Sequence, residues 1–127
     1  MSDDITTQAV RLAMSMNQLR AEIASQNIAR SSSPGAQASR LDFGRSQALL
    51  QQSVTASAQD AAALLPALSD AAYQPASGKA AYGAGSSSIN LDEEVADMAS
   101  ANLEYQALTE SLNRHFGLMR LAVTGKN

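Results

Sequence analysis

The chain contains no cysteine and no tryptophan, and it has only three tyrosines and two phenylalanines. Without cysteine it has no disulfide bond, no thiolate metal site and no cysteine nucleophile. Alanine supplies much of the 45% hydrophobic fraction, and its methyl group buries little surface, whereas burial stabilises a protein by about 25 cal/mol per Å². The 127 residues suffice for one domain. We therefore expect extended helical packing rather than a compact globule.

The chain also lacks a strong charge of either sign and a long hydrophobic run. Its net charge of −3 gives no basic footprint for nucleic acid or anionic lipid. The longest apolar run, residues 61–68, has eight residues and includes Pro66, whereas a membrane-spanning helix needs about 20 residues. Asp3 and Asp4 stand where a secretory signal has basic residues. We therefore expect neither a transmembrane span nor a cleaved signal.

The residue types that perform catalysis or bind metals are sparse. His115 is the only histidine, and with no cysteine or second histidine it cannot form an ordinary zinc site. It would act as a general base only beside a positioned nucleophile, and no such motif is present. Asp92, Glu93 and Glu94 are consecutive and diverge around a helix, so we interpret them as stabilising a helix N-terminus. The sequence predicts no enzyme, no cofactor and no metal.

A heptad repeat runs through the last third of the chain, from Asn90 to Thr124. Alternating steps of four and three residues average 3.5, the period of helices that wind around partner helices. Asn90 is a candidate N-cap with Glu93 placed as in a capping box, and Gly125 marks the end. The sequence predicts one helix of about 34 residues. Eight of its ten repeat positions are apolar, the exceptions being Asn102 and Thr109. The ten positions are Leu91, Val95, Met98, Asn102, Tyr105, Thr109, Leu112, Phe116, Met119 and Val123.

A second heptad repeat lies near the N-terminus and predicts a helix from residue 4 to about residue 30. Ser31–Gly35 ends it, because Pro34 does not fit a helix interior and Gly35 suits a turn. The stripe is typical of an amphipathic helix in a small bundle or of one half of a coiled coil. Its positions are Ile5, Ala9, Leu12, Met16, Leu19 and Ile23.

The predicted fold is mainly α: two long terminal helices form an antiparallel coiled-coil hairpin in which the two stripes face each other. Residues 1–35 and 89–127 form this core. Residues 36–88 are a connector with one short helix around 42–52 and an irregular, partly disordered stretch rich in Ala, Ser and Gly. Within that stretch, residues 61–68 are compatible with a turn or two of helix, and residues 73–82 with a short β-hairpin.

The predicted C-terminal helix also has apolar residues away from its stripe, more than the first helix can cover, and this indicates contacts with other chains. Asn102 and Thr109 are polar positions within the stripe. They either fix register and partner number, or lie where the helix is incompletely buried. We predict an assembly interface at Leu12, Met16, Leu19, Ile23, Asn27, Val95, Met98, Asn102, Tyr105, Leu112, Phe116 and Met119.

Two stretches carry a resemblance to a known family. Asn27-Ile28-Ala29, followed by Pro34-Gly35, resembles the segment that ends the first helix in bacterial flagellar rod and hook proteins. The C-terminal helix is similar to that of the proximal rod protein family of the bacterial flagellar basal body, which belongs to the flagellar axial proteins. This similarity rests on Asp92-Glu93-Glu94-Val95, Met98, Asn102, Tyr105-Gln106-Ala107-Leu108, Arg114 and Phe116.

The resemblance implies a structural subunit that assembles helically at the proximal end of the bacterial flagellar basal-body rod and transmits torque in motility. It implies type III export without a cleaved signal and location in the periplasm-spanning rod. The implied partners are copies of the same chain, other flagellar rod proteins and the basal-body adaptor at the export gate and membrane ring, with no nucleic acid and no small-molecule substrate. The alternative is a cytosolic coiled-coil adaptor or secretion chaperone, which would form a small defined oligomer.

Overall fold

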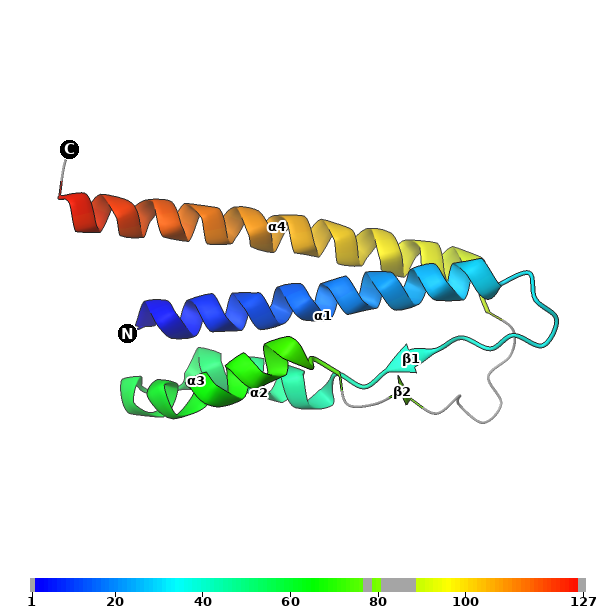
Figure 1. Cartoon of the computed structure of the whole chain (residues 1–127), viewed down its shortest axis with the longest axis horizontal. Helices are drawn as coiled ribbons and strands as arrows, with labels where there is room; N and C mark the ends of the chain where they lie inside the picture. The colour runs from blue at the N-terminus through cyan, green and yellow to red at the C-terminus, as the bar shows by residue number, and fades with distance from the viewer. Residues whose placement is uncertain (1, 77–78, 81–88, 126–127) are drawn as a thin grey trace.

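The computed structural model describes residues 2–76, 79–80 and 89–125 and is mainly helical, as predicted. Its two long terminal helices run antiparallel and pack against each other (Figure 1). The elements in chain order are α1 (Ser2–Arg30), β1 (Arg40–Leu41), α2 (Gly44–Thr55), α3 (Ala58–Tyr73), β2 (Lys79–Ala80) and α4 (Leu91–Thr124).

The ends of α4 are set by local signals in the sequence. The Asn90 side chain accepts a hydrogen bond from the Glu93 backbone N–H at 3.4 Å, which satisfies one of the unpaired donors of the first turn. At the other end, Gly125 adopts a left-handed conformation with φ of 59° and donates its N–H to the Leu121 carbonyl at 3.0 Å. The predicted bounds of this helix are therefore confirmed.

Helix α1 lies between α4 on one side and the pair α2 and α3 on the other (Figure 1). Two polar contacts show the antiparallel order of the long helices. Arg20 donates to Glu104 at 3.0 Å, and Asn27, further along α1, donates to Glu94, which is earlier in α4, at 3.1 Å. Between these contacts lie two buried alanines, Ala24 and Ala101, whose small side chains allow the helices to approach closely.

The hydrophobic core joins α1 to α2 and α3. In the part of the chain that the structure describes, its buried members come from these three helices: Ile5, Leu12, Met16, Leu49, Leu68 and Ala71. The prediction that the stripes of the two long helices face each other is therefore wrong. Ile5, Leu12 and Met16 of the α1 stripe are buried together with Leu49, Leu68 and Ala71 of α2 and α3, because clustering these apolar side chains removes them from water.

Helix α4 presents a slightly different heptad to α1 from the one predicted. Its two buried side chains are Glu94 and Ala101, seven residues apart. The predicted positions Met98, Tyr105, Leu112 and Met119 are half-buried, whereas Val95, Asn102 and Phe116 are exposed. The face of α4 that contacts α1 thus has the predicted seven-residue period. It is shifted by one residue, because Glu94 and Ala101 are buried in place of Val95 and Asn102.

The connector is more regular than predicted, because it contains two helices rather than one. Ser57 caps α3 by accepting from the Asp60 N–H at 3.3 Å, and the Ser46 hydroxyl of α2 donates to the Pro75 carbonyl at 2.6 Å. Instead of a local hairpin, β2 pairs antiparallel with the distant β1. Residues 77–78 and 81–88, also expected to be irregular, lie outside the described residues.

Replacement of Leu12 by alanine tests the position of the core. Leu12 is fully buried, so we expect Leu12→Ala to lower the free energy of unfolding by about 2–5 kcal/mol, measured by urea denaturation followed by circular dichroism. The matched control is Val54→Ala on the exposed side of α2, expected to change it by no more than about 0.5 kcal/mol. Equal effects of the two changes would contradict this core.

Candidate assembly interface

A buried polar cluster centred on Asn27 holds the end of α1 to β1 and to the start of α4. The Asn27 side chain is fully buried, and its amide has four partners. Its Nδ2 donates to the Ser39 carbonyl at 3.0 Å and to Glu94 Oε2 at 3.1 Å. Its Oδ1 accepts from the Ser39 N–H at 2.8 Å and from Arg30 Nη2 at 3.0 Å. Every hydrogen-bonding position of this amide is therefore used.

Glu94 brings a buried negative charge into the same cluster. Its side chain is 1% exposed, and its Oε1 lies 3.0 Å from Arg40 Nη2. The same guanidinium lies 3.5 Å from an Asp97 oxygen and 3.8 Å from a Glu93 oxygen, so it bridges β1 to the first turns of α4. A buried carboxylate requires such pairing, because desolvation of an unpaired charge is costly. We call Asn27, Ser39, Arg40 and Glu94 the Asn27 cluster.

Sequence reasoning identified Asn27 but assigned Glu94 only to the stabilisation of a helix N-terminus. It also missed Arg40 and Ser39. The one available signal was position: Glu94 lies seven residues before Ala101 and one before the predicted stripe position Val95. A glutamate at this position of a helix is as compatible with an exposed face as with a buried one. The sequence alone therefore did not identify the contact between Asn27 and Glu94.

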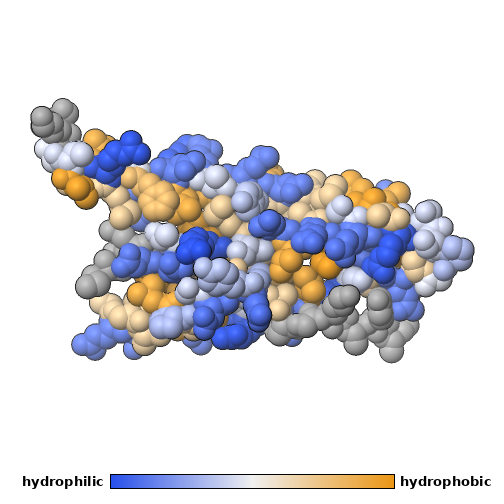
Figure 2. Space-filling view, viewed as in Figure 1, coloured by the Kyte–Doolittle hydropathy of each residue, from blue (hydrophilic) through white to orange (hydrophobic). Residues whose placement is uncertain are grey.

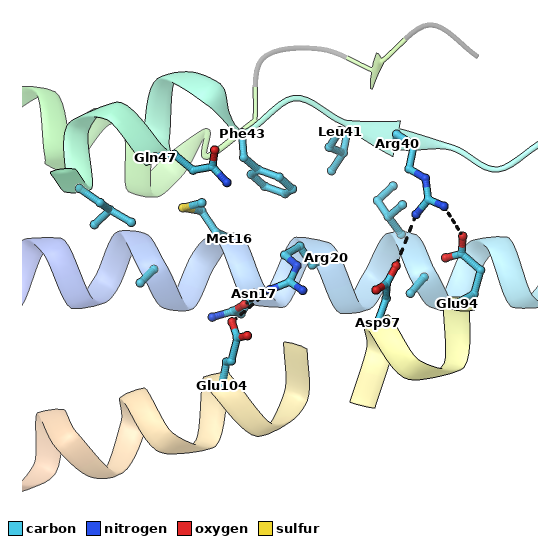
Figure 3. Close-up of a pocket in the computed structure, with 14 residues that line it drawn as sticks. Met16, Asn17, Arg20, Arg40, Leu41, Phe43, Gln47, Glu94, Asp97 and Glu104 are labelled. Atoms are coloured by element: carbon cyan, nitrogen blue, oxygen red, sulfur yellow. Dashed lines mark hydrogen bonds and ion pairs between the residues drawn. The ribbon is translucent and has the colours of Figure 1, made fainter. Parts of the chain in front are cut away.

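A cleft of about 590 Å³ lies beside the Asn27 cluster, between α1, α2, the β1 region and α4. Met16 and Phe43 point into it from opposite sides, and Ile23 and Leu50 also line it (Figure 3). Two ion pairs border it: Arg20 with Glu104 at 3.0 Å, and Arg40 with Asp97 at 3.5 Å. The cleft is therefore lined by apolar and polar side chains in equal number, and its charged side chains are paired with one another.

The structure divides the predicted interface residues into three groups. Leu12, Met16 and Asn27 are buried within the chain. Exposed positions are Val95, Asn102 and Phe116. The remaining residues are half-buried: Leu19, Ile23, Met98, Tyr105, Leu112 and Met119. Only the second and third groups offer surface to another molecule in this state of the chain.

Helix α4 carries most of the large apolar side chains that remain exposed. Four of the seven lie in its last turns, toward the end that extends beyond the N-terminal end of α1, where Figure 2 shows hydrophobic side chains, and the other three lie in its first half (Figures 1 and 2). Such a concentration on one element is typical of a surface that contacts another protein. The exposed apolar residues of α4 are Leu91, Val95, Leu103, Phe116, Leu118, Leu121 and Val123.

Removal of the Asn27 side chain tests whether the cluster stabilises the chain. Asn27→Ala leaves Glu94 Oε2 and the Ser39 backbone without their partner, so we expect a loss of about 1–3 kcal/mol in urea denaturation. Gln26→Ala, at an exposed position of the same helix, is the control. With Glu94→Gln, the double mutant should show a coupling energy of about 0.5–3 kcal/mol. Additive effects of the two substitutions on the free energy of unfolding would contradict the hydrogen bond between Asn27 and Glu94.

Among residues 2–76, 79–80 and 89–125, no three His, Asp or Glu side chains are grouped so that they could hold a metal ion. None of the described helices has the length and apolar character to cross a membrane. Comparisons with known family models, with curated proteins and with solved structures found no match to this chain.

Proposed function

We propose that this chain is a structural subunit of the bacterial flagellar basal-body rod, assembling helically at its proximal end and transmitting torque. The observation that carries the proposal is the set of large apolar side chains on α4 that the described residues of the chain leave exposed. An assembly in which neighbouring subunits cover these side chains would remove them from water, and each Å² so buried stabilises by about 25 cal/mol.

The residues behind the family resemblance support the proposal, because they have a definite physical role. Asn27, in the Asn-Ile-Ala segment, is fully satisfied by hydrogen bonds at the end of α1. Glu94, in the acidic start of α4, is one of its partners. The two stretches that resemble flagellar rod proteins are therefore in contact with each other through the Asn27–Glu94 hydrogen bond.

The proposed partners follow from the same resemblance. They are copies of this chain, other rod proteins and the basal-body adaptor at the export gate. The proposed location is the rod that crosses the periplasm, reached through the flagellar type III apparatus. A subunit that transmits torque needs stiff elements, and α4, with 34 residues, is a rod about 51 Å long.

A charged residue in place of one exposed apolar side chain of α4 tests this function. Phe116 is 43% exposed, so Phe116→Glu should leave the fold intact while opposing burial against a neighbouring subunit. We expect loss of swimming in the source bacterium and absence of the variant from purified basal bodies, measured by motility in soft agar and by immunoblotting. The same outcome is expected for Leu112→Asp, in which the half-buried position also affects α1 packing.

The matched control is Gln106→Glu, which adds the same charge at an exposed polar position of α4. It should retain motility and basal-body recovery, and circular dichroism should show equal helix content in both variants. Normal motility of Phe116→Glu cells would contradict the proposal. Recovery of the wild-type chain only in the cytoplasm, as a small oligomer, would favour an adaptor or secretion chaperone.

A further inference from the structure

Helix α1 has two neighbours that it contacts in chemically different ways. On one side it shares the hydrophobic core with α2 and α3, and α4 lies on the opposite side (Figure 1). The two buried residues of α4 are Glu94 and Ala101, one charged and one small. The buried side chains of the core come instead from the first three helices: Ile5, Leu12, Met16, Leu49, Leu68 and Ala71.

The contact between α1 and α4 is tightest at one end. Its buried groups lie where the start of α4 meets the second half of α1: Asn27 donates to Glu94 at 3.1 Å, and Ala24 and Ala101 are buried close by. Beyond Ala101 the same seven-residue period continues along α4, but its large apolar side chains are only half-buried. These half-buried positions are Tyr105, Leu108, Leu112 and Met119.

The two long helices diverge toward the other end. In Figure 1 the axes of α1 and α4 move apart in the direction of the N-terminal end of α1. A second cavity, of about 370 Å³, lies in this region between α1, the end of α3 and α4. Met14, Tyr73 and Leu112 are among its lining residues, one from each helix. Side chains that line a cavity lack packing partners on one side, so the later turns of α4 gain less from their contact with α1.

These differences predict that the two sides of α1 separate at different costs. Separation of α1 from α2 and α3 would expose Leu12 and Leu68, which are fully buried. Separation of the later turns of α4 from α1 would expose side chains that are already in partial contact with water. Proteins open locally in such units, and the units with few buried apolar contacts open at the lowest free energy.

We propose that α4 detaches from α1 as a separate unit while α1, α2 and α3 keep their common core. Detachment begins in residues 105–124, where the two long helices diverge, and the Asn27 cluster is the last contact to break. Helix α1 stays folded in the open state, because Leu12 and Met16 remain buried against α2 and α3. The face of α4 that packs on α1 thereby becomes accessible without unfolding of the core. This inference goes beyond the proposed function and does not rest on it.

Native-state hydrogen exchange of the full chain tests the detachment, because it measures openings segment by segment. Leu68→Ala weakens the core from α3, on the side of α1 opposite to α4. We expect exchange at least about tenfold faster in α3 and in residues 8–24 of α1, and a change of no more than about twofold in residues 105–124. An equal increase in all three segments would show that the chain opens as one unit and would overturn the proposal.

Glu94→Gln tests the role of the Asn27 cluster. The substitution removes the charge that pairs with Arg40 at 3.0 Å, so we expect exchange at least about tenfold faster in residues 92–103. The core should accelerate as well, since α4 leaves before the core unfolds, whereas residues 105–124 should change little. The matched control is Glu110→Gln, because Glu110 is exposed and pairs with Arg114 of the same helix. Unchanged exchange in residues 92–103 of Glu94→Gln would contradict the assigned order of opening.

Urea provides a second measurement that needs no substitution and therefore does not depend on the folding of a variant. Below the unfolding transition, the slope of the logarithm of the exchange rate against urea concentration reports the surface that an opening exposes. We expect the slope for residues 105–124 to be less than about half of the slope for α3. Equal slopes would show exchange through global unfolding and would overturn the proposal. Neither result depends on motility, so failure of the rod function and failure of the detachment are distinguishable.

Discussion

The position of α4 depends on the hydrogen bonds of one buried amide. Asn27 satisfies its four hydrogen-bonding positions with Ser39, Arg30 and Glu94, and Glu94 pairs with Arg40. A buried polar group of this kind tolerates little displacement, because a lost partner costs about 1–3 kcal/mol. It therefore fixes the register between α1 and α4, where the small residues Ala24 and Ala101 provide close approach but little apolar area.

This division of contacts leaves two different faces on the long helices. Helix α1 buries Leu12 and its neighbours against α2 and α3, which form the hydrophobic core. Helix α4 packs on the opposite side of α1 and keeps large apolar side chains in water, Leu103 among them. Burial of those side chains by other subunits is the free-energy source that the proposed assembly would use. One side of α1 is thus buried in the hydrophobic core, whereas α4, on the other side of α1, leaves large apolar side chains exposed.

The distribution of charge gives α4 a direction as well as an exposed face. Its first half carries five acidic side chains, and its last turns carry Arg114 and Arg120. The carboxylates that line the cleft are already paired within the chain, Glu94 and Asp97 with Arg40 and Glu104 with Arg20. The charges around the cleft are therefore largely balanced within one copy of the chain.

The sequence by itself determined the class of fold and the ends of the long helices, because caps and turns act locally: Asn90 and Gly125 bound α4, and Ser31–Gly35 follows α1. Only the tertiary structure decided which faces are buried. A heptad pattern states a period but not a partner, so the sequence did not show that α1 turns its stripe to α2 and α3. Nor did it show that Glu94 is buried, since a carboxylate is stable inside a protein only where distant groups, here Asn27 and Arg40, are brought to it.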